Sequence, residues 1–232
     1  MAVLSVTPKQ MKNSNKSSKV TRAWLNEHVN DAYVKLAQKE GYRSRAAYKL
    51  QEIDETFRLI KPGDLVIDLG SAPGAWSQYV QRKLSPRAVV AAELGPARGR
   101  ILALDILPMV AVEGVLFLQG DFRDDSVLQR LTLELQGVKA DLVLSDMAPN
   151  LSGIESADSA RIEHLVELAL EFAGRELKPQ GALVAKVFHG GAYSGLLARF
   201  KQTFEMVKPI KPRASRGRSS ETFLVGRGLL RP

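Results

Sequence analysis

Short apolar runs alternate with longer amphipathic stretches along most of the chain. The apolar runs have the length of β-strands, and they lie at 65–69, 100–105, 115–121, 140–146, 182–188, 204–207 and 221–225. The stretches between them carry apolar side chains at helical spacing, at 22–39, 44–57, 76–84, 123–135, 160–177 and 196–203. Strands that alternate with helices predict an α/β fold with a doubly wound, mostly parallel sheet.

The second strand has two candidates. Val89 to Glu93 and Arg100 to Asp105 are both apolar runs that end in an acid, and glycines and a proline separate them. A nucleotide-binding fold needs an acid at the end of this strand, because a carboxylate accepts hydrogen bonds from both ribose hydroxyls. Glu93 lies closer to the usual spacing of about 20 residues from the glycine turn. Asp105 is the alternative.

The turn after the first strand is built from small residues. Gly70 to Gly74 reads Gly-Ser-Ala-Pro-Gly, and the next helix follows at once. Small residues let a ligand approach bare backbone, and a helix start presents free N–H groups. The turn lacks the Gly-Lys-Ser/Thr that ends a phosphate loop, and Ala72 stands where the G-x-G-x-x-G fingerprint of a dinucleotide fold needs its second glycine. Its Asp-Leu-Gly start is similar to the first motif of S-adenosylmethionine (SAM) methyltransferases.

Composition places one globular domain in the cell interior. The chain has 232 residues, 45% of them hydrophobic, and no cysteine. We expect one domain over 21–232 after a disordered basic tail at 1–20, which is polar and lacks periodicity. The lack of cysteine excludes disulfides and thiolate metal sites. With no membrane-length apolar run and no signal sequence, we predict a cytoplasmic protein without a membrane partner.

Positive charge is concentrated in three segments. The net charge is +8. Residues 1–26 and 208–220 contain basic residues and no acid, and Arg43, Arg45 and Lys49 gather in a third short stretch. Three basic segments in one small protein predict a polyanionic partner such as RNA.

One charged residue lies inside an apolar strand. Lys186 is flanked by Val184, Ala185, Val187 and Phe188. A lysine at such a position is costly unless it is paired or faces a cleft, so Lys186 is a candidate functional residue. The three histidines are far apart in sequence and have no metal-binding spacing, so we expect no metal site.

Long phrases of the chain resemble the FtsJ/RrmJ family of RNA ribose 2′-O-methyltransferases, from about Trp24 to Arg227. The resemblance rests on Arg-Ser-Arg-Ala-Ala-Tyr-Lys-Leu at 43–50, Asp-Leu-Gly-Ser-Ala-Pro-Gly-Ala-Trp-Ser-Gln-Tyr-Val at 68–80, Leu-Gln-Gly-Asp-Phe-Arg-Asp at 118–124, Ser-Asp-Met-Ala-Pro-Asn at 145–150, Val-Glu-Leu-Ala-Leu at 166–170 and Lys-Val-Phe at 186–188. It implies a Rossmann-like seven-stranded sheet, SAM as cofactor and a uridine ribose of 23S rRNA in the large ribosomal subunit as substrate.

The resemblance also implies site residues. It places Lys49, Asp146, Lys186 and Glu221 in a catalytic tetrad. The implied cofactor residues are Gly74 and Trp76 beside the methionine part, Asp105 at the ribose, Asp121 at the adenine amino group, and Asp146. This favours Asp105 over Glu93, which has no counterpart phrase.

The chain departs from the family pattern at two places. Ala75 stands where the family commonly has glycine, and 86–98 is longer than the usual turn. No step of the chemistry needs a glycine at position 75. We interpret 86–98 as a mobile surface insertion.

The chemistry of methyl transfer explains the implied tetrad. The cofactor's leaving group is already activated, so the enzyme must align the reactants and help a weakly acidic hydroxyl. Lys186 can accept the hydroxyl proton only when it is neutral, and burial beside a second cation such as Lys49 favours that form. We assign Lys186 as base or hydroxyl-steering group, Asp146 as its orienting partner, and Lys49 and Glu221 to substrate positioning.

Three other functions are less consistent with the residues. Base-nitrogen methyltransferases often carry an aromatic residue after the fourth strand, and the loop from Asp146 to Asn150 has none. An RNA-binding module without catalysis would have no need for Lys186 in a central strand. An NAD(P)-dependent oxidoreductase lacks its glycine pattern here. We expect a monomer, since no apolar surface stripe stands out.

Overall fold

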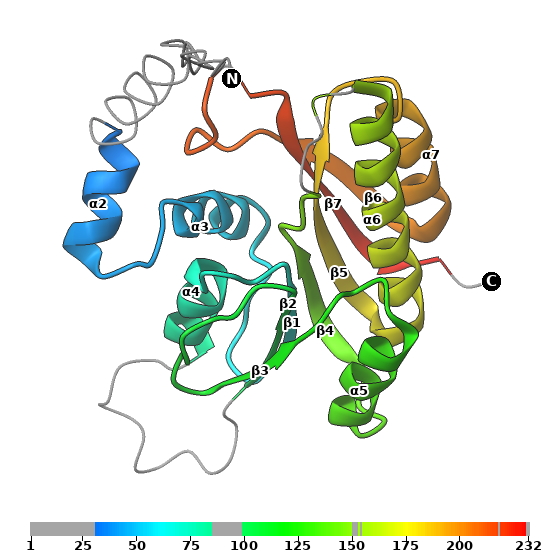
Figure 1. The fold of residues 1–232 in the computed structure, drawn as a ribbon. Helices are drawn as coiled ribbons and strands as arrows, with labels where there is room; N and C mark the ends of the chain where they lie inside the picture. The colour runs from blue at the N-terminus through cyan, green and yellow to red at the C-terminus, as the bar shows by residue number, and fades with distance from the viewer. Residues whose placement is uncertain (1–30, 85–98, 150–152, 154, 218, 231–232) are drawn as a thin grey trace, which may run out of the picture.

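Seven strands form one sheet in the order β3-β2-β1-β4-β5-β7-β6, with helices on both faces (Figure 1). The computed structural model describes residues 31–84, 99–149, 153, 155–217 and 219–230. All neighbouring strands pair in parallel except at β7, which is antiparallel to both β5 and β6. This confirms the predicted fold class.

The bounds of the elements follow the predicted alternation. The strands are β1 Leu65–Leu69, β2 Arg100–Asp105, β3 Val115–Gln119, β4 Ala140–Ser145, β5 Leu177–Phe188, β6 Phe204–Ile210 and β7 Glu221–Leu229. The helices are α2 Ala32–Glu40, α3 Ala46–Phe57, α4 Ala75–Leu84, α5 Asp125–Leu135, α6 Glu155–Glu176 and α7 Tyr193–Thr203.

The sheet divides the core into two halves because successive side chains of a strand point to opposite faces. In β1, Ile67 packs with residues of α5, α6 and α7, whereas Val66 packs with residues of α3 and α4. Both side chains are fully buried. The central strands are therefore apolar on both faces, which is why they appear as continuous apolar runs in the sequence.

Several elements extend beyond the predicted bounds. β5 begins at Leu177, whereas the predicted run begins at 182. The pairing of β4 with β5 shifts register between Ala140 and Leu142, so the backbone at 179–181 departs from regular pairing within the assigned strand. β7 runs to Leu229, because its pairing with both neighbours stabilises residues beyond the apolar run.

The antiparallel β7 fixes the position of the last tetrad residue. Its register pairs Phe223 with Lys186 and Glu221 with Phe188. Because β7 runs against the other strands, its first residue lies at the carboxyl edge of the parallel strands. Ligands bind at this edge in open α/β sheets.

Some predictions fall on residues outside the described ranges. These are the tail at 1–20, the first part of the helix at 22–39, the strand at Val89–Glu93 and the insertion at 86–98. Arg100–Asp105 is confirmed as a strand and pairs with β1. Among the described helices, none has the length and apolar character needed to cross a membrane.

A buried carboxylate joins α3, the following turn and α4. Asp54 is 3% exposed. Its Oδ1 accepts hydrogen bonds from the backbone N–H groups of Leu59 and Ile60 at 3.0 and 2.9 Å, and its Oδ2 accepts from the Tyr79 hydroxyl at 2.8 Å. Burial and the nearby Asp54 charge raise the pKa of Tyr79, so its hydroxyl keeps the proton that it donates. Asp54 therefore satisfies three buried donors.

We expect Asp54→Ala to lower the free energy of unfolding by about 3 kcal/mol, because it leaves these buried donors unpaired. Urea denaturation would measure the change. Glu55→Ala is the matched control, since Glu55 is the exposed neighbour on the same helix, and it should change stability by less than about 0.5 kcal/mol. Equal stability of the two variants would contradict the assigned role of Asp54.

Candidate active site

Lys186 lies buried near the carboxyl end of β5, on the sheet face covered by α3 and α4. The residue is 8% exposed. Its Nζ donates a 2.6 Å hydrogen bond to the backbone carbonyl of Asp146 and lies 3.0 Å from Asp146 Oδ1. Asp146 follows β4, the strand next to β5, and its N–H donates to the carbonyl of Leu69 in β1. The structure thus brings the predicted pair together across two adjacent strands.

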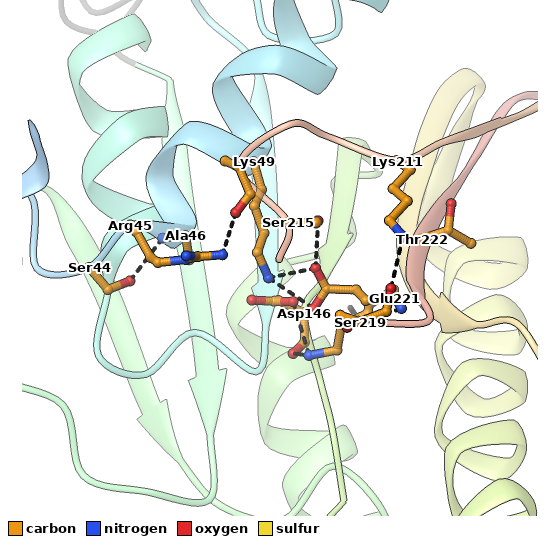
Figure 2. Close-up of polar contacts among 12 residues, drawn as sticks. Ser44, Arg45, Ala46, Lys49, Asp146, Lys211, Ser215, Ser219, Glu221 and Thr222 are labelled. Atoms are coloured by element: carbon orange, nitrogen blue, oxygen red, sulfur yellow. Dashed lines mark hydrogen bonds and ion pairs between the residues drawn. The ribbon is translucent and has the colours of Figure 1, made fainter. Parts of the chain in front are cut away.

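A second ion pair lies on the same face. Figure 2 shows the Lys49 side chain reaching from α3 to the carboxylate of Glu221, with Asp146 beside them. Lys49 Nζ is 2.7 and 2.9 Å from the two oxygens of Glu221, and the Ser215 hydroxyl donates to Oε1 at 2.8 Å. The Lys49 ammonium also lies 5.8 Å from the centre of the Phe223 ring. All four predicted tetrad residues therefore meet at one place.

Charge controls the protonation of Glu221. Burial by itself would raise the pKa of the Glu221 carboxyl, but the Lys49 ammonium, the Ser215 hydroxyl and the Lys186 ammonium outweigh this effect. The pKa of Glu221 therefore lies below its ordinary value. Glu221 is therefore a carboxylate at neutral pH.

The basic stretch from Arg43 to Lys49 has a structural role, because its side chains bind other segments of the same chain. Arg45 forms an ion pair with Asp31 and donates to the carbonyl of Ala214. Lys49 is paired with Glu221. Each of these cations thus has a partner within the protein, and contact of the stretch with a polyanion stays a prediction. The stretch ties α3 to the chain before it and to the loop before β7.

The small-residue turn after β1 fits closely against its neighbours. Gly70 has φ +76°, and a Cβ there would lie 2.8 Å from the backbone of Met147. Gly74 has φ +107°, and a Cβ there would lie 2.8 Å from the Arg43 guanidinium and 2.9 Å from the sulfur of Met109. Both positions thus need glycine for conformation and for space.

Two side chains tie this turn to the loop at 106–112. The Arg43 guanidinium donates to the carbonyls of Pro73, Val110 and Ala111, at 2.9 Å for Pro73 and 2.6 Å for Ala111. Asp105 accepts from the N–H of Ala72 and from the N–H of Leu107, each at 2.8 Å. Arg43 and Asp105 each bond to both loops and so hold them together.

Three buried oxygens beside the turn make no hydrogen bond within the described part of the chain. They are Oδ1 of Asp68, Oγ of Ser71 and Oδ1 of Asp146. Oδ1 of Asp146 has the Lys186 ammonium 3.0 Å away as its ion-pair partner, so the acceptors without any partner are those of Asp68 and Ser71. The other oxygen of Asp68 accepts from the Ser77 hydroxyl at 2.6 Å. Burial raises the pKa of Asp68 to about 7; the Ser77 hydroxyl opposes this shift, and the charges of Asp146 and Asp105 add to it. Free acceptors at this depth suit a ligand that carries an ammonium group, as the methionine part of SAM does.

Two predicted cofactor residues have other partners. The Trp76 indole is buried, donates to the carbonyl of Ala46 at 2.8 Å and packs against Phe223. Because the side chain is engaged in these contacts, only the main chain of Trp76 can face a cofactor in the turn. Asp121 follows β3 at the sheet edge and pairs with Arg123 at 2.6 Å, and hydrogen bonds from Arg123 lower the pKa of Asp121.

The acids that lie near Asp68 in the structure are not the ones that the order of strands in the sequence suggests. Asp68, Asp121 and Asp146 each lie in or directly after a strand of the parallel part of the sheet, so their places in the sequence alone would predict that all three lie together at its carboxyl edge. The charges that act on Asp68 come from Asp146 and Asp105, whereas Asp121 lies at the end of β3, two strands away. Sequence reasoning missed Arg43 and Ser77 as parts of the site. No signal in the sequence marks their contacts, which join segments that are distant along the chain.

Within the described ranges, no group of histidine and acidic side chains could hold a metal ion.

Replacing Arg43 by lysine tests its position between the loops. Lysine keeps the charge but cannot reach three carbonyls in one plane. We expect the dissociation constant for SAM to rise about tenfold, equivalent to the loss of about 1.4 kcal/mol, with RNA affinity unchanged. Calorimetric titration of SAM without RNA would measure it, and Arg130→Lys on α5 is the control. Weaker RNA binding with unchanged SAM affinity would show instead that Arg43 contacts RNA.

Comparisons with known proteins agree with this geometry. The family model described as FtsJ-like methyltransferase matches residues 42–229. The ribosomal RNA large subunit methyltransferase E of Albidiferax ferrireducens is 70% identical over 221 residues, which cover 94% of this chain and 99% of that protein. The protein of the same name from Acidovorax sp. is 64% identical and covers 95% and 99% of the two chains.

A solved structure shares the fold. It is a protein from Plasmodium falciparum assigned as a ribosomal RNA methyltransferase, with a TM-score of 0.69 and 26% identity. The match covers 82% of this chain and all of that one. Together with the matched family model and the high identity of the bacterial relatives, it shows that the chain belongs to the FtsJ-like methyltransferase family.

Proposed function

We propose that this protein transfers a methyl group from SAM to the 2′-hydroxyl of a uridine in 23S rRNA of the large ribosomal subunit. The observation that carries the proposal is the buried Lys186, held by Asp146 at the carboxyl edge of the sheet beside the Lys49–Glu221 pair. A cation at this depth is costly, so its presence calls for a chemical role. The names of the bacterial relatives, which specify large-subunit ribosomal RNA, support the substrate class.

The turn after β1 and the loop at 106–112 hold the cofactor in this proposal. Bound SAM supplies an electrophilic methyl group on a positively charged sulfur. The free Oδ1 of Asp68 accepts from its ammonium group, with Asp146 beside it, and the turn at Gly74 and Trp76 lies along its methionine part. Asp105 lies at the ribose, and Asp121 exchanges part of its contact with Arg123 for the adenine amino group.

Lys186 acts on the hydroxyl of the substrate. Its Nζ orients the 2′-oxygen toward the methyl group, or takes its proton as the new bond forms. Asp146 fixes the amine through its backbone carbonyl and its carboxylate. Lys49 and Glu221 line the same face and position the nucleotide.

Exposed cations near this edge suit an RNA substrate. Arg213 is 86% exposed at its side chain on the segment between β6 and β7, Lys211 is exposed on the same segment, and Lys208 is exposed near the end of β6. The segment is held against α3 through the bond from Arg45 to Ala214. Phosphate contacts from such side chains would position RNA over Lys186.

The experiment uses labelled SAM and large ribosomal subunits from cells that lack this protein. After transfer, the rRNA is digested and the labelled nucleoside is identified. We expect 2′-O-methyluridine as the product. Label on a base nitrogen would contradict ribose methylation, and transfer to small subunits alone would contradict the substrate.

A further inference from the structure

A pair of stacked aromatic rings lies directly beyond the strand that carries Lys186. The centres of the His189 and Tyr193 rings are 4.5 Å apart, and their planes meet at 34°. His189 is exposed, whereas Tyr193 is partly buried against the core. The N–H of His189 donates to the carbonyl of Ser220 at 2.9 Å, next to Glu221. One ring therefore supports the other, and the pair is anchored beside the tetrad.

Three glycines surround the rings without a structural need for glycine. Gly190, Gly191 and Gly195 lack the positive φ that favours this residue, and a Cβ at any of them would meet no atom within 4 Å. Gly195 lies inside α7, where glycine is less favourable than alanine. Neither backbone conformation nor packing explains these residues. Their shared effect is a bare surface next to an exposed ring.

We propose that this surface, formed by His189, Tyr193 and the three glycines, binds an unpaired nucleobase of the RNA by stacking it on His189. The proposal rests on the proposed function. Single-stranded RNA is recognised mainly by stacking unpaired bases on aromatic side chains, including histidine. The missing Cβ atoms let the sugar and phosphate of that nucleotide approach the main chain.

The position of the surface limits which nucleotides it can hold. His189 follows Lys186 by three residues, which span about 10 Å of extended chain. The methylated ribose must lie at Lys186, so the stacked base belongs to the same nucleotide or to a direct neighbour. Holding that base on His189 keeps the ribose from turning away from Lys186, which adds to alignment of the 2′-hydroxyl.

Two alanine variants separate this role from a role in stability. Gly195→Ala should raise the melting temperature by about 2–4 °C, yet raise the KM for large subunits severalfold. Gly174→Ala is the matched control, because Gly174 is also an exposed helical glycine with nothing within 4 Å. It lies near the end of α6, which runs straight into the opposite end of β5. This control should raise the melting temperature similarly and leave KM unchanged.

Substitutions at His189 test the stacking itself. His189→Ala should raise KM for large subunits roughly tenfold, with the SAM dissociation constant within twofold of wild type. His189→Phe keeps a stacking ring and should stay within threefold of wild-type KM. The proposal is overturned if His189→Ala leaves KM unchanged, or if Gly195→Ala behaves like Gly174→Ala. Failure of the wild-type protein to methylate large subunits would instead contradict the proposed function, before any variant is compared.

Discussion

Lys186→Ala lowers the rate of methyl transfer roughly 10²–10⁴-fold at saturating RNA and SAM. This expected loss follows from removing the only side-chain cation that contacts Asp146 in the described part of the chain. The 2′-hydroxyl then has neither an oriented partner nor a proton acceptor. SAM affinity should stay within about threefold of wild type, since Lys186 acts on the nucleophile. Single-turnover kinetics and calorimetry would measure the two quantities.

The control and a second substitution sharpen this test. Lys178→Ala changes an exposed lysine at the other end of the same strand, paired with Asp141, and should leave the rate unaffected. Lys186→Arg keeps a donor that cannot lose its proton. A partly active Lys186→Arg enzyme would indicate that the residue steers the hydroxyl, and an inactive one that it accepts the proton. Near-normal turnover by Lys186→Ala would remove Lys186 from the mechanism.

Glu221→Ala should lower the free energy of unfolding by about 3 kcal/mol, because it leaves the Lys49 ammonium buried without its partner. Both side chains are nearly enclosed, with 13% and 12% of their surface exposed. The Ser215 hydroxyl loses its acceptor as well. Replacing the pair together, as Lys49→Met with Glu221→Leu, should recover most of the stability but none of the methyl transfer.

Denaturation of wild type, Lys49→Met, Glu221→Leu and the double variant, with transfer assays on each, separates stability from function. The effect of pH provides a further check. Since the folded-state pKa of Glu221 is depressed, its contribution to stability is present above its ordinary pKa and is lost as the pH falls through the lowered value. Recovery of activity by the double variant would show that the pair serves the fold alone.

The sequence was a good guide to the strands and to Lys186. Strands buried on both faces are apolar throughout, so a single lysine within one of them is visible without coordinates. The ends of the elements were less predictable. β7 extends to Leu229 because it pairs on both sides, and that pairing depends on the order of strands in the sheet.

The basic stretch shows what a sequence cannot reveal. Its positive charge is evident from the residue types, but the partners of Arg43 and Arg45 lie in loops that are distant along the chain. Charge alone favoured RNA contact. In the structure both guanidinium groups donate to backbone carbonyls, and Arg45 also pairs with Asp31, which is a role suited to their five rigid donors.

The position of β7 between β5 and the edge strand β6 has a consequence for how the protein is made. Residues 221–229 are synthesised after every other strand, yet they must enter the sheet between β5 and β6. Until they emerge from the ribosome, β6 has no partner in the sheet, and the nascent chain lacks Glu221. Earlier strands can pair as they appear, since domains begin to fold during translation. The candidate active site is therefore completed last, so we expect an incompletely translated chain to be inactive as well as unstable.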